Sequence, residues 1–461
     1  MVDLLTPRQG GALALALMAT SVWSAPYYTA ERVEPDGATD LNDRGQVLLS
    51  TPWQGAKVGA VWSPGGALLP LTAPTNTALG IETDLVRMNN RGLVVGGSTY
   101  YEGGENKGMR AVLWQGGRPI YLGTFGTDAT GVGYSRAHDV NEAAVVVGEA
   151  AHYDARGRTL GTSAFRWRNG RLEALAPLAV DPTGYGGANA SKINEAGLAV
   201  GYSTLYHRGE FTNQATLWDA TGRAVALGSL YDGIEQGRPY STAYDINEAG
   251  QGVGVSELVD PTGYFGKARA TLWSDGAIVD LGTLQAPWGG PLDSAAVDIN
   301  NQGQVLVHAS ATDEHGVVFS ASGIWKDGQL EEIATPPYYQ FGNPQGTRAV
   351  AINDAGVVVG LGTCEDRSTG AFHECVQVAL DGKTFEDLNR LVDLPGWRLS
   401  YEAELNESGQ ILALGIDPTG REASFLLSPV PEAASWACML MGLATLALLR
   451  ELRLPSALQR F

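Results

Sequence analysis

An apolar residue followed by asparagine recurs eight times along the 461-residue chain. The first two intervals between successive asparagines are 47 and 52 residues, and the remaining five are each 53. Self-similarity at such a period is the signature of a solenoid, a propeller or an array of small units. The eight asparagines are Asn42, Asn89, Asn141, Asn194, Asn247, Asn300, Asn353 and Asn406.

A glycine follows the asparagine three residues later in every copy except the third, which has Ala144. Asparagine can hydrogen-bond its own backbone two residues on, and glycine accepts a positive φ, so Asn-x-x-Gly predicts a tight hairpin turn. The clearest turns are Asn194 to Gly197, Asn247 to Gly250, Asn300 to Gly303 and Asn353 to Gly356.

Each copy then offers three further short strands. One leaves the turn, as in Val357-Val358-Val359-Gly360, and one runs into a tryptophan, as in Ala215-Thr216-Leu217-Trp218. The last leaves a second turn, as in Ala277 to Leu281. The strand to tryptophan is replaced by Val378-Ala379-Leu380 in copy seven and by Phe425-Leu426-Leu427 in copy eight. Four antiparallel strands in about 50 residues are typical of a propeller blade. We therefore expect an all-β propeller of about eight four-stranded blades, with a β-solenoid or two stacked sandwiches as the alternatives.

The two ends of the repeat region predict how the ring closes. The last copy ends at Leu427 and runs into Ser428-Pro429-Val430-Pro431, so it lacks a fourth strand, whereas a spare strand, Tyr27 to Val33, precedes the first asparagine. We predict that this N-terminal strand completes the last blade, which gives eight blades within residues 25–428.

The N-terminus resembles a secretory signal peptide covering residues 1–24. Arg8 precedes the apolar run Gly11 to Val22, and Val22 and Ser24 suit the −3 and −1 positions of a cleavage site. A buried N-terminal helix is the alternative.

The C-terminal residues 429–461 carry a second apolar run. Ala433 to Leu449 contains no charge and is followed by Arg450 and Arg453. A run of this length makes about 26 Å of helix, near the lower limit for crossing a membrane. The arginines would keep that end in the cytoplasm and the propeller outside. We expect a C-terminal transmembrane helix, with a docked core helix as the alternative.

The order of features in this tail resembles the PEP-CTERM sorting signal. Val430-Pro431-Glu432 is followed by Trp436, the apolar span and Arg450, although Ala433 stands where the family has proline. The resemblance implies a Gram-negative bacterium, an exosortase-type peptidase as processing partner, transient anchoring in the membrane, and final placement at the cell surface or outside the cell.

The repeat units resemble the HAF repeats of bacterial extracellular proteins. The match is carried by Ile352-Asn353 through Gly360, by Ser163-Ala164-Phe165-Arg166-Trp167 and by Asp280-Leu281-Gly282, although the histidine that names the family is absent. The resemblance covers nearly residues 27–427 and implies extracellular placement.

Composition and motifs exclude several classes of function. The formal net charge of −19 argues against binding to nucleic acid, which needs a basic surface. The six histidines have no ligand spacing, and the chain has no nucleophile elbow, phosphate loop or dinucleotide fingerprint. Asp40 to Gly45 superficially resembles a calcium loop, but its apolar Leu41 indicates a strand and a turn. We predict no catalytic, cofactor-binding or metal-binding residue.

Two of the three cysteines flank one loop. Cys364 and Cys375 are eleven residues apart, and a disulfide between them is the favoured interpretation in an oxidising compartment. A metal site that also uses His373 is the alternative, and Cys438 lies within the apolar tail.

Antiparallel order places the first and third connections of every blade on one face of the disc and the longer second and fourth connections on the other. Long connections on a rigid scaffold are the usual place for binding. Three of them contain Asp-Pro-Thr-Gly (from Asp181, Asp260 and Asp417), which fits either plain turns or a carbohydrate-facing surface.

We therefore expect an exported, non-enzymatic binding or structural propeller at the cell surface or in an extracellular matrix, with exopolysaccharide as a candidate partner. The alternative is a carbohydrate-active hydrolase or lyase. It would need a pair of inward carboxylates about 5–10 Å apart.

Overall fold

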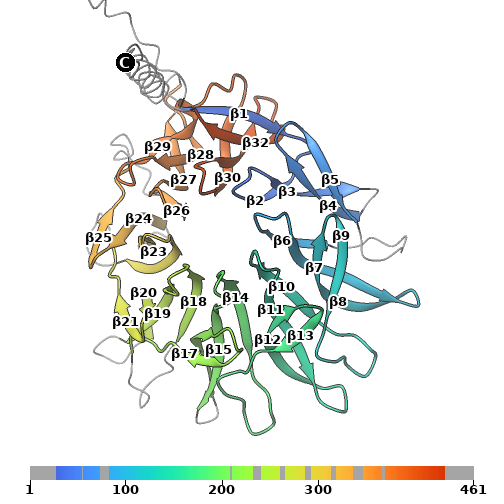
Figure 1. The fold of residues 1–461 in the computed structure, drawn as a ribbon. Coiled ribbons are helices and arrows are strands. Elements are labelled where there is room, and N and C mark those ends of the chain that lie inside the picture. The colour runs from blue at the N-terminus through green and yellow to red at the C-terminus, as the bar shows by residue number, and fades with distance from the viewer. Residues whose placement is uncertain are drawn as a thin grey trace, which may run out of the picture.

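The computed structural model describes residues 27–430 except 54–55, 73–82, 208–209, 232–239, 260–264, 286–291, 313–317, 336–345 and 366–368. Eight four-stranded antiparallel sheets stand around a common axis, as Figure 1 shows. The prediction of an eight-bladed, all-β propeller is confirmed, and one short 3₁₀ helix is the helical element of the described residues.

The blades follow the repeat, with strands a, b, c and d running outward from the axis. Blade 1 is β2 (Ala38–Leu41), β3 (Val47–Trp53), β4 (Ala56–Ser63) and β5 (Ala67–Leu71); blade 2 is β6 (Thr83–Met88), β7 (Val94–Glu102), β8 (Glu105–Gln115) and β9 (Arg118–Gly123). Blade 3 is β10 (Ser135–Val140), β11 (Val146–Tyr153), β12 (Thr159–Arg168) and β13 (Arg171–Ala174); blade 4 is β14 (Ala188–Ile193), β15 (Ala199–His207), β16 (Glu210–Trp218) and β17 (Ala224–Ala226).

Blade 5 is β18 (Ser241–Ile246), β19 (Gly252–Val259), β20 (Phe265–Ser274) and β21 (Ala277–Asp280); blade 6 is β22 (Asp293–Ile299), β23 (Val305–Thr312), β24 (Val318–Lys326) and β25 (Gln329–Glu332). Blade 7 is β26 (Arg348–Ile352), β27 (Val358–Glu365), β28 (Phe372–Ala379) and β29 (Glu386–Asp387), followed by the 3₁₀ helix η2 (Leu388–Arg390). Blade 8 is β30 (Arg398–Leu405), β31 (Ile411–Ile416), β32 (Glu422–Pro429) and the N-terminal β1 (Tyr28–Val33).

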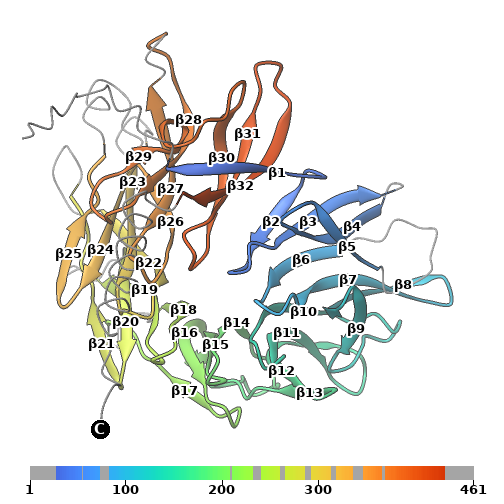
Figure 2. The same ribbon diagram turned by 45° about the horizontal axis from the view of Figure 1, so that its top comes forward.

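The ring closes through the N-terminal strand. β1 pairs antiparallel with β32 from Tyr28 opposite Pro429 to Val33 opposite Ser424, and Figure 2 shows the blue strand lying across the red blade. Tyr28 and Val33 are both buried, so the strand contributes to the core as well as to the sheet. The predicted closure is confirmed.

Tryptophans at the end of strand c fill the spaces between blades. Trp62, Trp114 and Trp218 are among the largest fully buried side chains. The indole N–H groups of Trp114 and Trp218 donate to carbonyls of the preceding blade, Thr72 and Ala176. Burial of a large apolar side chain contributes roughly 1.5–3 kcal/mol, so these indoles stabilise the contacts between neighbouring blades.

A β-bulge in strand a explains the glycine that ends the Val-Val-Gly motif. In blade 3 the pairing of β10 with β11 shifts between Ala137 and Asp139. A Cβ atom on Gly148 would then lie 2.1 Å from the carbonyl oxygen of Arg136, which no side chain tolerates. A bulge changes the direction of the side chains around it, and here it lies directly before Asp139, whose side chain turns towards the axis.

One expectation about the connections is wrong. Strands b and c form long hairpins with short ends, such as β7 and β8 joined by Gly103 and Gly104, because the strands themselves are extended. Among the connections that the structure describes in full, the long ones are d–a connections, such as that from Gly123 to Ser135. We call the face with the b–c hairpins and d–a connections the long-loop face, and the opposite one the tight-turn face.

The predicted signal peptide and nearly all of the predicted sorting tail, with Pro431, Glu432, Trp436 and Arg450, lie outside the described residues. In the part of the chain that the structure describes, no helix has the length and apolar character needed to cross a membrane.

Candidate functional site

The asparagines of the repeat form a closed ring of hydrogen bonds at the tight-turn face. Each Nδ2 donates to the main-chain carbonyl of the next asparagine, for example Asn194 to Asn247 at 3.0 Å, and Asn406 returns to Asn42 at 2.9 Å. Within each turn the Oδ1 atom accepts backbone N–H groups, as Asn194 does from Leu198. The asparagine therefore stabilises both its own turn and the contact between blades. The other six links run from Asn42, Asn89, Asn141, Asn247, Asn300 and Asn353.

A second ring lies beside the first. The residue after each asparagine donates its backbone N–H to the side chain of the equivalent residue in the next blade, as Glu142 does to Glu195 at 2.8 Å. The ring closes from Glu407 to Asp43 at 2.9 Å. Both rings have a structural role, so the predicted repeat-turn residues belong to the scaffold.

Charged side chains gather around the axis beside these rings, in strand a of the blades. They occupy the position two residues before the asparagine in every blade except blade 7, which has Ala351, and no site was predicted at this position. Several of them also bond the next blade; Asp139, for example, accepts the N–H of Ile193 at 3.0 Å. The eight residues are Asp40, Arg87, Asp139, Lys192, Asp245, Asp298, Ala351 and Glu404. Five acids and two bases thus face a common axis.

The pKa values of this axial ring reflect crowding of like charges. Burial, together with the charge and hydrogen bond of Asp245, raises the pKa of Asp298 well above its usual value. Burial and the charge of Asp40 raise the pKa of Glu404 to about 7, although water reaches this side chain along the axis. Burial by itself lowers the pKa of Arg87. The carboxylates of blades 1, 3, 5 and 8 outweigh this effect and raise its pKa above the ordinary value.

On the long-loop side of blades 2 to 4, the polar groups near the axis are paired with one another. Both carboxylate oxygens of Glu149 are used, one by the Tyr134 hydroxyl at 2.9 Å and one by the Asn189 amide at 3.1 Å. Arg136 forms an ion pair with Asp84 at 2.5 Å. Because these bonds run between neighbouring strands and blades, the cluster stabilises the ring more than it offers free groups to a ligand.

A pocket of about 310 Å³ opens on the long-loop side of blades 7 and 8. Arg348, Glu374 and Tyr401 line it, and Tyr401 leaves 40% of its surface exposed. The hydrogen bond from Tyr401 to Glu374 raises the pKa of the phenol. Nearby, burial and the charge of Arg348 lower the pKa of His308 to about 4, so this imidazole is neutral at pH 7. The pocket thus combines an aromatic face, a carboxylate and a guanidinium.

Two of the Asp-Pro-Thr-Gly segments are ordinary turns. Asp181 accepts the backbone N–H groups of Thr183 and Tyr185, and Asp417 accepts those of Thr419 and Arg421. Their carboxylates are committed to the loop, which agrees with the turn interpretation of this motif. The third copy, from Asp260, lies outside the described residues.

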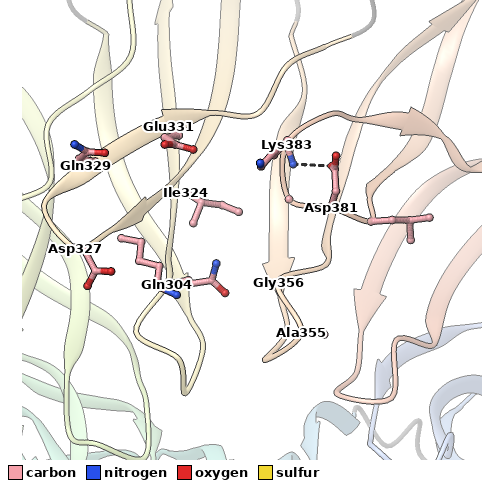
Figure 3. Close-up of a pocket in the computed structure, with 12 residues that line it drawn as sticks. Gln304, Ile324, Asp327, Gln329, Glu331, Ala355, Gly356, Asp381 and Lys383 are labelled. Carbon is pink, nitrogen blue, oxygen red and sulfur yellow. Dashed lines mark hydrogen bonds between the residues drawn. The ribbon is translucent and has the colours of Figure 1, made fainter.

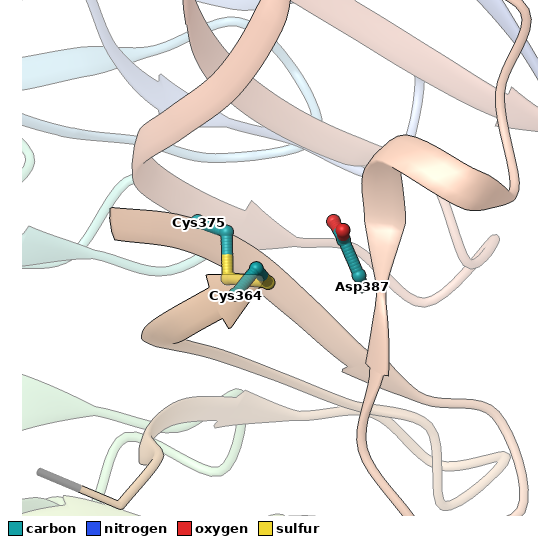
Figure 4. A group of neighbouring side chains, drawn as sticks. All are labelled: Cys364, Cys375 and Asp387. Atoms are coloured by element: carbon teal, nitrogen blue, oxygen red, sulfur yellow. A yellow bond between two sulfur atoms is a disulfide. The ribbon is translucent and has the colours of Figure 1, made fainter. Parts of the chain in front are cut away.

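Cys364 and Cys375 are joined by a disulfide between neighbouring strands of blade 7, with the Cα atoms 5.8 Å apart. Asp387 lies beside them, as Figure 4 shows, and all three side chains are buried. Sulfur atoms in a disulfide are poor metal ligands, because metals bind the thiolate. The disulfide links the strands that carry Thr363 and Glu374, so it fixes one wall of the pocket.

No family model matches the chain, and no curated protein matches it significantly. Among solved structures, the β-propeller domain of the Trilobed protease from Pyrococcus furiosus is similar at 10% identity and a TM-score of 0.39, over 75% of this chain and 95% of that one. An acylaminoacyl peptidase from Pyrococcus horikoshii is similar at 12% identity and 0.38, over 77% of this chain and 53% of that one.

A Trypanosoma rangeli sialidase in complex with sialic acid is similar at 10% identity and a TM-score of 0.31, over 88% of this chain and 62% of that one. Similarity at this level concerns the propeller architecture alone.

Proposed function

We propose that the protein is an exported, non-enzymatic propeller that binds carbohydrate chains through its long-loop face. The observation that carries this proposal is the pocket lined by Arg348, Glu374 and Tyr401. Its volume of about 310 Å³ is at the lower end for small-molecule sites. That size suits one or two sugar residues of a longer chain.

Each of the three side chains has a part in this proposal. The exposed ring of Tyr401 offers an apolar face on which a sugar ring can stack. Glu374 accepts hydrogen bonds from hydroxyl groups, and Arg348 donates to ring or carboxylate oxygens. A neutral His308 adds no further positive charge, so a neutral or mildly acidic glycan suits the pocket.

Hydrolysis is the second proposal, and the pair Asp245 and Asp298 is the observation that favours it. Inward carboxyl groups were the feature expected of a hydrolase. However, these two are hydrogen-bonded to each other, whereas glycosidase carboxyls stand about 5–10 Å apart. Within the described lining of the long-loop pocket, Glu374 is the one carboxylate, which favours binding over hydrolysis.

Export and anchoring complete the proposal and rest on sequence alone. Residues 1–24 would direct secretion, the apolar run Ala433 to Leu449 would anchor the chain, and an exosortase-type peptidase would act near Val430-Pro431-Glu432. Expression with and without such a peptidase, followed by the intact mass of the exported chain, tests this part. An identical mass in both strains would contradict processing.

The binding proposal is tested on a glycan array with the propeller, residues 26–430. Tyr401→Ala and Glu374→Gln should abolish signals that the unchanged protein gives. Tyr185→Ala is the matched control, because Tyr185 is 43% exposed and lies on the connection from β13 to β14 of the same face. Silence of the unchanged protein across all glycans would reject the proposal, and released sugar products would favour hydrolysis.

A further inference from the structure

Blade 7 lacks the tryptophan that blades 1 to 6 carry at the end of strand c. In blade 2, Val94 pairs with Trp114, but in blade 7 the equivalent Val358 pairs with Ala379. An indole is therefore missing from the interface between blades 6 and 7. This is the same copy in which the sequence has Val378-Ala379-Leu380 instead of a strand ending in tryptophan.

Phe385 takes over the two contacts of the missing indole. Its ring is fully buried in the same cluster as Leu306, Ile333 and Val358. Its backbone N–H donates to the carbonyl of Ala334 at 2.9 Å, as the indole of Trp114 donates to Thr72. The c–d turn of blade 7 also contacts blade 6, because Ala334 donates to the carbonyl of Lys383, just as Thr72 of blade 1 donates to Gly117 of blade 2.

A cavity of about 370 Å³ lies between blades 6 and 7 on the tight-turn face. Figure 3 shows Ile324, Asp327 and Glu331 on one side and Asp381 and Lys383 on the other. Phe385 restores the packing of the deep core, where it is buried together with Ala379.

Charged groups of both signs, from blades 6 and 7, surround this cavity. Asp381 is committed to its own turn, because it accepts the N–H groups of Lys383 and Thr384. Two ammonium groups and two carboxylates remain, those of Lys326, Lys383, Asp327 and Glu331. Among the described residues, none of these four side chains has an ion pair or a hydrogen bond. A ligand that carries one charge of each sign would satisfy groups on both sides.

Gln304 adds a further polar group that the repeat normally uses. In blades 1 and 8 the glutamine after the turn donates to a serine, Gln46 to Ser63 and Gln410 to Ser428. Blade 6 has Lys326 at the place of that serine, so the Gln304 side chain lacks this partner and lines the cavity instead. Ile324 and Leu380 supply an apolar wall.

We infer that this cavity binds a small zwitterion, namely a free amino acid or a short peptide with both ends charged. The carboxylates Asp327 and Glu331 receive its ammonium group, and Lys326 and Lys383 receive its carboxylate. The apolar wall contacts its side chain. This site lies on the face opposite the proposed carbohydrate pocket, and its occupation does not depend on that proposal.

The test is calorimetric titration of the purified full chain with each of the common amino acids and a set of unblocked dipeptides. At least one probe should bind with a stoichiometry of one, and its N-acetylated amide, which lacks both charges, should not. Asp327→Asn and Lys383→Gln should each weaken binding at least about tenfold, since each removes a charge-assisted bond. Leu380→Trp should abolish binding by filling the cavity.

Asp275→Asn is the matched control, because Asp275 occupies the same turn position in blade 5 and both residues have a φ of 51°. It should bind as the unchanged protein does, and near-UV circular dichroism should confirm that every variant is folded. Absence of binding by all probes at millimolar concentration would overturn the inference. So would binding that survives Leu380→Trp, or equal binding of probes that carry a single charge.

Discussion

The tight-turn face and the long-loop face of the propeller differ in how regularly their hydrogen bonds repeat. At the tight-turn face every blade repeats the same bonds, so that the links from Asn42 to Asn406 form a ring without interruption. At the long-loop face neighbouring blades differ: Glu149 is bound by Tyr134 and Asn189, whereas Glu374 borders an open pocket with Tyr401. The repeat thus encodes the scaffold at one end and leaves the other end free to vary.

Removal of β1 should have the largest effect on the scaffold end. A chain that starts at residue 34 leaves β32 without its partner and exposes the core that Tyr28 and Val33 cover. We expect a loss of at least about 5 kcal/mol in the free energy of unfolding, because a paired strand and two buried side chains disappear. Urea denaturation followed by circular dichroism measures it.

The comparison chain starts at residue 27 and should unfold in one cooperative transition. If the shorter chain were equally stable, the ring would not depend on its N-terminal strand, and the closure would have no energetic role.

Asn194→Ala should have the next largest effect. The change leaves the N–H of Leu198 without its side-chain partner and removes one of the two hydrogen bonds that the carbonyl of Asn247 accepts, at a cost of about 3 kcal/mol. Asn106→Ala, at the exposed end of the β7–β8 hairpin, loses one local bond to Gly108 and should cost only about 0.5 kcal/mol. Equal losses in the two variants would remove the distinction between the two ends.

The sequence predicted the scaffold because the scaffold repeats. The 53-residue period, the turn at Asn194 and the spare strand before Asn42 led to eight blades and to their closure. The period and the turn recur along the chain, and the spare N-terminal strand matches the strand that the last copy lacks. The sequence pattern alone is therefore sufficient to find them.

The candidate site could not be found in the same way. The axial position holds Asp40, Arg87 and Ala351 in different blades, so its chemistry does not recur, and only its fixed offset from the asparagine could have revealed it. The pocket joins Glu374 of blade 7 to Tyr401 of blade 8, a neighbourhood that depends on the angle between blades. The b–c connections were misjudged because extended hairpins and loops have similar composition.

Glu404→Gln should have a smaller, pH-dependent effect at the axis. The folded pKa of about 7 exceeds the usual 4.5, so the folded state keeps a proton that the unfolded state releases between these values. The stability that this group contributes is therefore full below about pH 4.5 and lost as the pH rises through 7. Because water reaches the side chain, we expect the variant to gain only about 1 kcal/mol relative to the unchanged protein between pH 4.5 and 8.

Urea denaturation at several pH values checks this expectation, with Glu102→Gln as a control at the exposed end of a hairpin. Parallel pH profiles for the unchanged protein and the Glu404 variant would show that the axial carboxyl is not shifted.

The smallest effect on stability should come from the pocket itself. Tyr401 and Glu374 are both exposed, so Tyr401→Ala and Glu374→Gln should each change the free energy of unfolding by less than about 0.5 kcal/mol. The same variants should nevertheless lose glycan binding, because both side chains line the pocket and the bond between them is exposed to water. A variant that lost both stability and binding would show that these residues belong to the scaffold. The division into a structural tight-turn face and a binding long-loop face would then be wrong.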